Sequence, residues 1–102
     1  MLDKTIRRVN IDQMKGLYRL HVNNAGGRKE GVFVAEKEDV DRLVKNRTRI
    51  LLDECILGDY YSTVLDMDEN SISLISEDQG LVKAMESLNL CYGINPFELE
   101  II

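Results

Sequence analysis

The stretch GLYRLHVNNAGGRKEGVFVAE, residues 16–36, determines the fold that we expect. Residues 16–23 alternate apolar and polar side chains from Tyr18 to Asn23, which is the period of a half-buried strand. Residues 30–36 are again rich in strand-forming side chains, and the Asn and Gly residues between the two runs tolerate the positive φ angles of a turn. The stretch therefore predicts a β-hairpin.

Two later segments change to the helical period. Residues 36–46 carry an apolar stripe, acids in the first turn and bases near the last turn, which is typical of a short amphipathic helix. Residues 76–89 predict a second helix, because Ser76 and Gln79 have the spacing of a capping box and Asn89 suits a left-handed end. Its apolar face consists of Leu81, Val82, Met85 and Leu88.

Three further strands are expected at residues 48–56, 60–67 and 71–77. The first, TRILLDECI, is apolar enough to be central in a sheet, and DENS, residues 68–71, is expected to be a hairpin turn between the other two. The ending INPFELEII, residues 94–102, turns at Asn-Pro and then alternates like an edge strand.

The segment DMDENSISLISE, residues 66–77, also approaches the pattern of an EF-hand calcium loop. Its acidic and amide side chains occupy loop positions one, three, five and twelve. However, Ser71 stands where the loop requires glycine, Ser73 stands where it prefers an aliphatic residue, and no helical pattern precedes the segment. We therefore predict a turn, with no metal site and no cofactor.

Together these patterns predict an α+β fold, a single and mostly antiparallel sheet of five to six strands with two short helices. The expected order is ββαβββα, followed by the optional C-terminal edge strand. Residues 14–102 form one predicted domain, and residues 1–13 are an N-terminal extension or an extra element. Two helices cover only one sheet face, so we expect a homodimer through the other face or through an edge strand such as FELEII, residues 97–102. In the alternative arrangement, residues 1–13 cover the second sheet face within the monomer.

Composition limits the function classes. A chain of 102 residues with 44% hydrophobic and 30% charged residues is typical of one globular domain. It has neither the ~20-residue apolar run of a membrane span nor the apolar core of a signal peptide, so we predict a cytoplasmic protein without membrane contact. Cys55 and Cys91 fit no metal or redox spacing, and His21, the only histidine, adjoins no nucleophile motif.

Charge is distributed unevenly along the chain. Residues 1–49 hold twelve bases and seven acids, whereas residues 50–102 hold one base and eleven acids, for a net charge of −5. One interpretation is two surfaces of opposite charge, and the other is that strands from both halves interleave so that the charges pair. The acidic total argues against nucleic-acid binding.

The preferred function is a non-enzymatic module whose acidic C-terminal half binds a basic protein. One tyrosine of the Tyr60-Tyr61 pair has to face outward in a strand, and exposed tyrosine beside acids suits an interface. The predicted protein-binding residues are Asp59, Tyr60, Tyr61, Asp66, Asp68 and Glu69.

The alternative function is capture of a small anionic metabolite or nucleotide. The loop AGGRK, residues 25–29, exposes backbone amides and two bases, although it lacks the order of a phosphate-binding P-loop. The predicted ligand-binding residues are Arg19, His21, Gly26, Gly27, Arg28 and Lys29. An enzyme ranks third, because no residue pattern identifies a catalytic group.

The runs YRLHVN, GVFVAEKEDVDRLV, ILGDYYSTVLDMDENSISLISED and YGINPFELE, in that order, resemble small uncharacterised proteins carried by phages and prophages. The resemblance covers roughly residues 14–100 and implies a phage-encoded protein that acts on a host or defence protein. It implies no catalytic residue. Such relatives carry basic residues or His after the Leu-Gly that matches Leu57-Gly58, whereas this chain has Asp59 and two tyrosines, which puts a shared anion-binding role in doubt.

Overall fold

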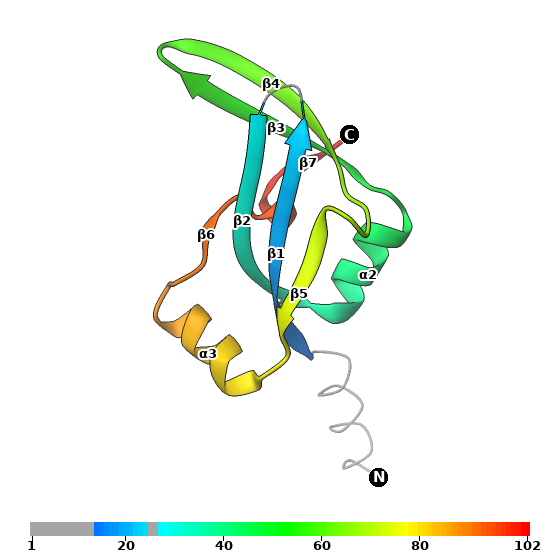
Figure 1. The fold of residues 1–102 in the computed structure, drawn as a ribbon, viewed down its shortest axis with the longest axis vertical. Coiled ribbons are helices and arrows are strands. Elements are labelled where there is room, and N and C mark those ends of the chain that lie inside the picture. The colour runs from blue at the N-terminus through cyan, green and yellow to red at the C-terminus, as the bar shows by residue number, and fades with distance from the viewer. Residues whose placement is uncertain (1–13, 25–26) are drawn as a thin grey trace.

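The computed structural model describes residues 14–24 and 27–102, and this part of the chain has an α+β fold with two helices and two antiparallel sheets (Figure 1). The first sheet has the strand order β5-β1-β2-β6, and the second has the order β4-β3-β7. The elements, in chain order, are β1 (Lys15–Asn24), β2 (Gly27–Glu36), α2 (Lys37–Lys45), β3 (Arg49–Ile56), β4 (Asp59–Asp66), β5 (Ile72–Ser76), α3 (Gln79–Ser87), β6 (Tyr92–Gly93), the 3-10 helix η1 (Pro96–Glu98) and β7 (Glu100–Ile101). The predicted class and the order ββαβββα are confirmed, but the prediction of a single sheet is wrong. Residues 1–13 lie outside the described part.

The predicted hairpin is formed by β1 and β2. Tyr18 pairs with Phe33, and their rings stack at a centroid distance of 5.9 Å on the face that enters the core. The strands are longer than predicted, because Asn24 pairs with Gly27 and only two residues link them. The bases of the predicted loop therefore belong to β2.

The chain forms two sheets because it leaves the second sheet at the end of β4 and joins the first sheet at β5. The turn DENS forms as predicted, and Asp68 Oδ1 accepts hydrogen bonds from the backbone N–H groups of Asn70 and Ser71 at 2.8 and 3.0 Å. The predicted hairpin partner is wrong, however, because β5 pairs with β1 and not with β4. Met67 is completely buried before the turn and Ile72 is buried after it, so both ends of the turn are anchored in the core while Glu69 and Asn70 remain exposed.

The main core lies between the two sheets and α2. The stripe of α2 contributes Val40 and Leu43, β3 contributes Ile50 and Leu52, and β4 contributes Leu65. These side chains pack on the inner face of the first sheet. Burial at about 25 cal/mol per Å² of apolar surface is the main source of stability here. Sheet packing on sheet thus supplies the cover that we expected a second copy or residues 1–13 to provide.

α3 lies against the opposite face of the first sheet (Figure 1). Of its predicted apolar face, Val82 is buried against Leu17 and Val32, whereas Leu81 and Leu88 are exposed. Its N-cap is Asp78, whose side chain accepts hydrogen bonds from the N–H groups of residues 80 and 81 at 2.8 and 3.2 Å.

The predicted capping box of Ser76 and Gln79 is therefore wrong. The Ser76 hydroxyl instead accepts a hydrogen bond at 3.0 Å from the backbone N–H of Asp78, the residue directly before the helix. From this position the carboxylate of Asp78 reaches the first free N–H groups and takes the capping role. Asn89 has the predicted left-handed conformation, with φ 54°.

The C-terminal segment closes both sheets. β6 pairs with β2, where Gly31 lies opposite Gly93, and a Cβ added at Gly31 would stand 2.0 Å from the carbonyl oxygen of Ile94. β7 then pairs with Ile50 and Leu51 of β3, which confirms the C-terminal edge strand and the central position of β3.

Candidate functional site

The outer part of β3 and β4 forms a two-stranded arm, residues 52–64, that projects from the rest of the fold (Figure 1). β7 pairs with β3 only as far as Leu51, so in the described part of the chain β4 is the one strand partner of the rest of β3. Leu57 and Gly58 connect the two strands with φ angles of 53° and 85°. Positive φ at both central residues is the mark of a type I′ hairpin turn.

The arm has two faces because directly opposite residues of an antiparallel pair point the same way. Its inner face continues the core side of the sheet and carries Glu54, Ile56, Asp59 and Tyr61. Its outer face carries Asp53, Cys55, Tyr60, Ser62 and Val64.

Beyond Leu52, which is buried at its base, the apolar side chains of the arm are wholly or partly exposed. Leu57 at the turn is 99% exposed and Tyr60 on the outer face is 85% exposed. Ile56, Tyr61 and Val64 are each about half exposed. The exposed parts of these side chains gain no stability from the fold, so the arm presents apolar surface that is available to another molecule.

Leu57 is also conformationally unfavourable at its position. A type I′ turn strongly prefers Asn-Gly or Asp-Gly, and a left-handed conformation costs other residues about 1–2 kcal/mol. The chain nevertheless places leucine there, with its side chain in solvent. Neither turn formation nor core packing explains this choice.

The base of the arm is fixed by an ion pair between the two sheets. Lys29 Nζ of β2 lies 2.6 Å from Glu54 Oε1 of β3, and Lys29 is only 9% exposed. Lys29 lies opposite Val22 and so points into the space between the sheets. It therefore does not share a surface with the other predicted ligand-binding residues.

The predicted acidic site is divided into two parts. Asp59, Tyr60 and Tyr61 lie near the tip of the arm, whereas Asp66, Asp68 and Glu69 lie at the end of β4 and in the turn after it. Asp66 follows Asp59 by seven positions along the strand, or about 23 Å at 3.3 Å per residue. The two groups do not form one surface.

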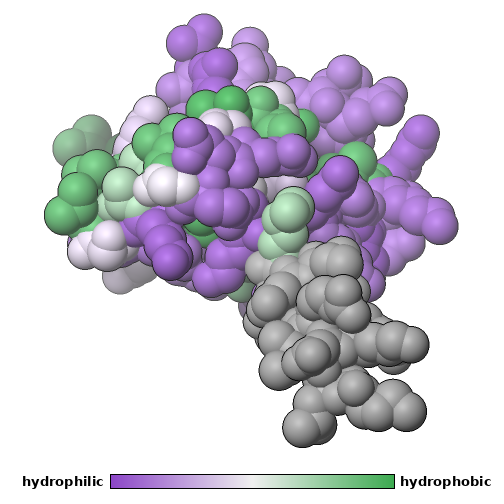
Figure 2. Space-filling view, turned by 90° about the horizontal axis from the view of Figure 1, so that it is seen from below, coloured by the Kyte–Doolittle hydropathy of each residue, from purple (hydrophilic) through white to green (hydrophobic). Residues whose placement is uncertain are grey.

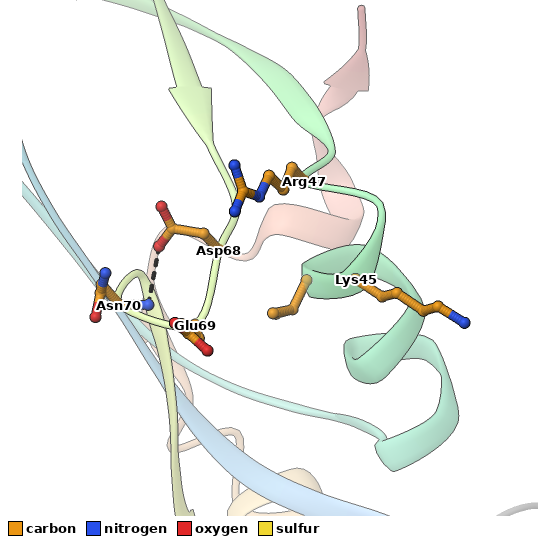
Figure 3. Close-up of a pocket in the computed structure, with 6 residues that line it drawn as sticks. Lys45, Arg47, Asp68, Glu69 and Asn70 are labelled. Carbon is orange, nitrogen blue, oxygen red and sulfur yellow. Dashed lines mark hydrogen bonds between the residues drawn. The ribbon is translucent and has the colours of Figure 1, made fainter.

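The acids at the base interact with bases of the same chain. Asp66 lies 3.0 Å from Arg49 Nε, and Asp68 and Glu69 line a hollow of about 300 Å³ into which Arg47 points, while Lys45 points away (Figure 3). Hydrogen bonds from the turn, chiefly from the backbone N–H of Asn70, lower the pKa of Asp68, and the nearby charge of Arg47 adds to this effect.

The predicted ligand-binding residues are partly brought together on the face of the first sheet beside α3. Arg19, His21 and Arg28 surround Glu30, with their nitrogens 3.0, 3.9 and 3.9 Å from Glu30 Oε1. Gly27 has φ 103° as a turn residue, and Gly26 lies outside the described residues. The acid at the centre of this basic cluster was not predicted.

The uneven charge of the sequence is partly balanced in space. Among the described residues, four ion pairs join the basic first half to the acidic second half, namely Lys15–Glu86, Lys29–Glu54, Lys37–Glu77 and Arg49–Asp66. This follows from the interleaving of strands, since β5 of the second half pairs with β1 of the first. The interpretation of paired charges is the one that the structure supports.

A second apolar area lies on the side of α3. The face seen from below is mostly polar with several apolar areas (Figure 2). α3 lies on that lower side in Figure 1, where Leu81 and Leu88 are exposed together with Leu90 and Tyr92.

Comparisons of the chain with family models, with curated proteins and with solved structures found no match. In the part of the chain that the structure describes, no helix is long and apolar enough to cross a membrane. The same residues contain no group of three potential metal ligands.

Proposed function

We propose that the protein is a non-enzymatic protein-binding module that docks on a basic partner protein through the tip and inner face of the arm. The contact residues are Leu57, Asp59 and Tyr61, with Ile56 beside them. The carrying observation is Leu57, a completely exposed leucine held in a left-handed conformation that favours asparagine or glycine. Sequences depart from local preference in this way mainly at functional positions.

The chemistry of the tip supports a protein partner. Tyrosine and aliphatic side chains on a projecting hairpin can enter a pocket and provide most of the binding energy. Asp59 has no ion pair among the described residues, so its charge is free to favour a partner whose apolar pocket is bordered by Lys or Arg. This acidic determinant is smaller than the whole C-terminal half, because four acids of that half are paired within the chain.

The biological setting of this proposal comes from the sequence resemblance. The protein is encoded by a phage or prophage, acts in the cytoplasm, and its basic partner is a host or defence protein.

The sharpest test separates binding from stability. Leu57→Asn suits the turn better, so it is expected to raise the free energy of unfolding by about 1 kcal/mol. The same variant is expected to lose partner capture from a host lysate, and Asp59→Lys is expected to weaken capture and its dependence on salt. Leu88→Asp is the matched control, because Leu88 is an exposed leucine (65%) on the opposite side of the molecule.

The proposal requires capture of the same partner by the wild type and by Leu88→Asp, with loss in the arm variants. Equal capture by Leu57→Asn and wild type would reject it. So would loss of capture only in Leu88→Asp, which would place the binding surface at α3.

A second candidate function is the capture of a small anionic metabolite or nucleotide. It rests on the cluster of Arg19, His21 and Arg28. Three bases converge on one oxygen of Glu30, so an anion has to displace that carboxylate. Glu30→Gln is therefore expected to strengthen anion binding. A thermal-shift series with nucleotides tests this, since ligand at 100 times its Kd adds about 2.7 kcal/mol. No shift in either protein would exclude this function.

A further inference from the structure

Between its terminal aspartates, the free edge of β4 has none of the features that normally protect an edge strand. Among the described residues, β4 is the last strand of its sheet, with β3 on one side only. Natural proteins block such edges with proline, lysine, bulges or short strands. β4 is eight residues long, pairs with β3 without a bulge, and has the uncharged sequence YYSTVL, residues 60–65, between its terminal aspartates.

The hairpin geometry identifies the backbone groups that are free at this edge. A two-residue turn is closed by a hydrogen-bonded pair, here Ile56 and Asp59. Hydrogen-bonded and non-hydrogen-bonded pairs alternate along an antiparallel ladder. The N–H and C=O groups of Tyr60, Ser62 and Val64 therefore point away from β3.

We propose that these groups pair with the same groups of a second copy of the chain, so that two arms join edge to edge about a twofold axis at Ser62. The two three-stranded sheets become one sheet of six strands. Tyr60 of one copy lies opposite Val64 of the other, and each Ser62 lies opposite its counterpart. Two hydrogen bonds in each of these three pairs give about six backbone hydrogen bonds.

Symmetry and side-chain chemistry together select this axis. A twofold axis perpendicular to a sheet leaves each side chain on its own face, and directly opposite residues of paired strands point to the same face. Since neighbouring residues of one strand point to opposite faces, the axis has to place a residue opposite its own counterpart and not opposite its neighbour. An axis at Thr63 would place Tyr60 against Asp66, and an axis at Tyr61 would place Tyr60 against Ser62. Only the axis at Ser62 joins the aromatic side chain to β-branched Val64, a favourable cross-strand pair.

The charges of β4 are compatible with this pairing. With the axis at Ser62, Asp59 lies opposite Leu65 of the other copy and Asp66 lies opposite Gly58, so no two carboxylates face each other. Asp66 is moreover paired with Arg49 of its own chain. A second copy therefore fits the edge without repulsion.

This inference goes beyond the proposed function and uses a different part of the arm. The edge is occupied by the second copy, whereas Leu57, Asp59 and Tyr61 at the tip and inner face remain for the partner protein. A dimer would present two such tips.

A disulfide at the axis gives the most direct test. Opposite Cα atoms of a hydrogen-bonded antiparallel pair are about 5.5 Å apart, within the range of about 4.4–6.8 Å that disulfides span. Ser62→Cys, with the free Cys55 and Cys91 changed to Ser, is expected to form a covalent dimer under mild oxidation. Ser73→Cys, an exposed strand serine of β5, is the matched control and is expected to stay largely unlinked.

Mass measurement tests the same pairing without a new bond. The wild type is expected at about twice its chain mass of 11.7 kDa at micromolar concentration. Ser62→Pro removes an N–H that β3 does not use and is expected to give the single mass. Ser62→Ala loses the same hydroxyl contact with Asp53 but keeps the N–H, so it is expected to remain dimeric.

A wild type of single mass, or a dimer whose Ser62→Cys form links no faster than Ser73→Cys, would overturn the proposal. If Ser62→Pro does not fold, as judged by circular dichroism, the linking rate decides. Leu57→Asn is expected to keep the dimer while losing partner capture, so the two proposals fail separately.

Discussion

Removal of the Glu54 carboxylate is expected to destabilise the fold strongly, because it leaves the ammonium group of Lys29 between the two sheets without its partner. The side chain of Lys29 is 10% exposed and that of Glu54 is 30% exposed, at a nitrogen-to-oxygen distance of 2.6 Å. Breaking a buried pair from one side costs about 3–5 kcal/mol, and the partial exposure of Glu54 places Glu54→Ala near the lower value, about 3 kcal/mol. At about 4–8 °C per kcal/mol, Tm falls by about 12–24 °C.

Urea unfolding followed by circular dichroism measures this change. Lys29→Met is expected to lose only about 1 kcal/mol, because the remaining carboxylate at Glu54 is partly hydrated. The double variant Lys29→Met with Glu54→Leu is expected close to the wild type, since two apolar groups replace two charges. Exposed ion pairs contribute about 0–1 kcal/mol. If Glu54→Ala lowered the free energy of unfolding by less than about 0.5 kcal/mol, the pair would behave like an exposed one, which would refute this account. An equal loss in both single variants would contradict the role of burial.

Three further outcomes are expected from local geometry. Gly31→Ala forces a methyl group against the Ile94 carbonyl 2.0 Å away, so we expect a loss of about 2–4 kcal/mol in urea unfolding, and a loss under 1 kcal/mol would contradict the close approach. The pKa of Asp68 in the folded protein is below its usual 3.8, so the stability that its carboxylate contributes is complete above pH 3.8 and is lost as the pH falls through the folded pKa. In Asp68→Asn, the free energy of unfolding is therefore expected to fall less between pH 5 and pH 2 than in the wild type. Asp78→Ala removes the N-cap of α3 and is expected to lower the free energy of unfolding by about 1 kcal/mol, more than Ser76→Ala does. If thermal unfolding showed the larger loss for Ser76→Ala, Ser76 would be the cap.

The sequence was sufficient for elements whose pattern is local. The hairpin of β1 and β2 follows from alternation on both sides of an Asn- and Gly-rich turn, and α2 follows from the stripe of Val40 and Leu43. The left-handed Asn89 was likewise predictable, because a single residue type at a helix end carries the signal.

The division into two sheets could not be predicted in the same way. The alternation of residues 60–67 and 71–77 is the same whether the two strands pair with each other or with distant partners. The difference lies in Met67 and Ile72, whose burial on the two sides of the turn depends on the whole core. Lys29 was misplaced for a similar reason, since its partner Glu54 is 25 residues away in the chain.

The candidate site was predicted in part. Asp59, Tyr60 and Tyr61 were singled out as a tyrosine pair beside an acid in a predicted strand, but Leu57 itself was not singled out. The available signal was the Leu-Gly pair at a position where a tight hairpin prefers Asn-Gly. Asp66, Asp68 and Glu69 were grouped with the tyrosines because they are near in sequence, although Asp59 and Asp66 lie at opposite ends of the extended strand β4.

The pairing of β5 with β1 has a consequence for the order in which the fold can form. Leu20 lies opposite Ile72, 52 residues later in the chain, whereas β1 with β2 and β3 with β4 are joined by short turns. The two hairpins can form within microseconds, while the distant pairing waits for a larger loop to close. During synthesis the β5 side of β1 therefore stays open until residues beyond Ser76 have emerged, and in that interval the nascent chain exposes this unpaired edge in addition to that of β4.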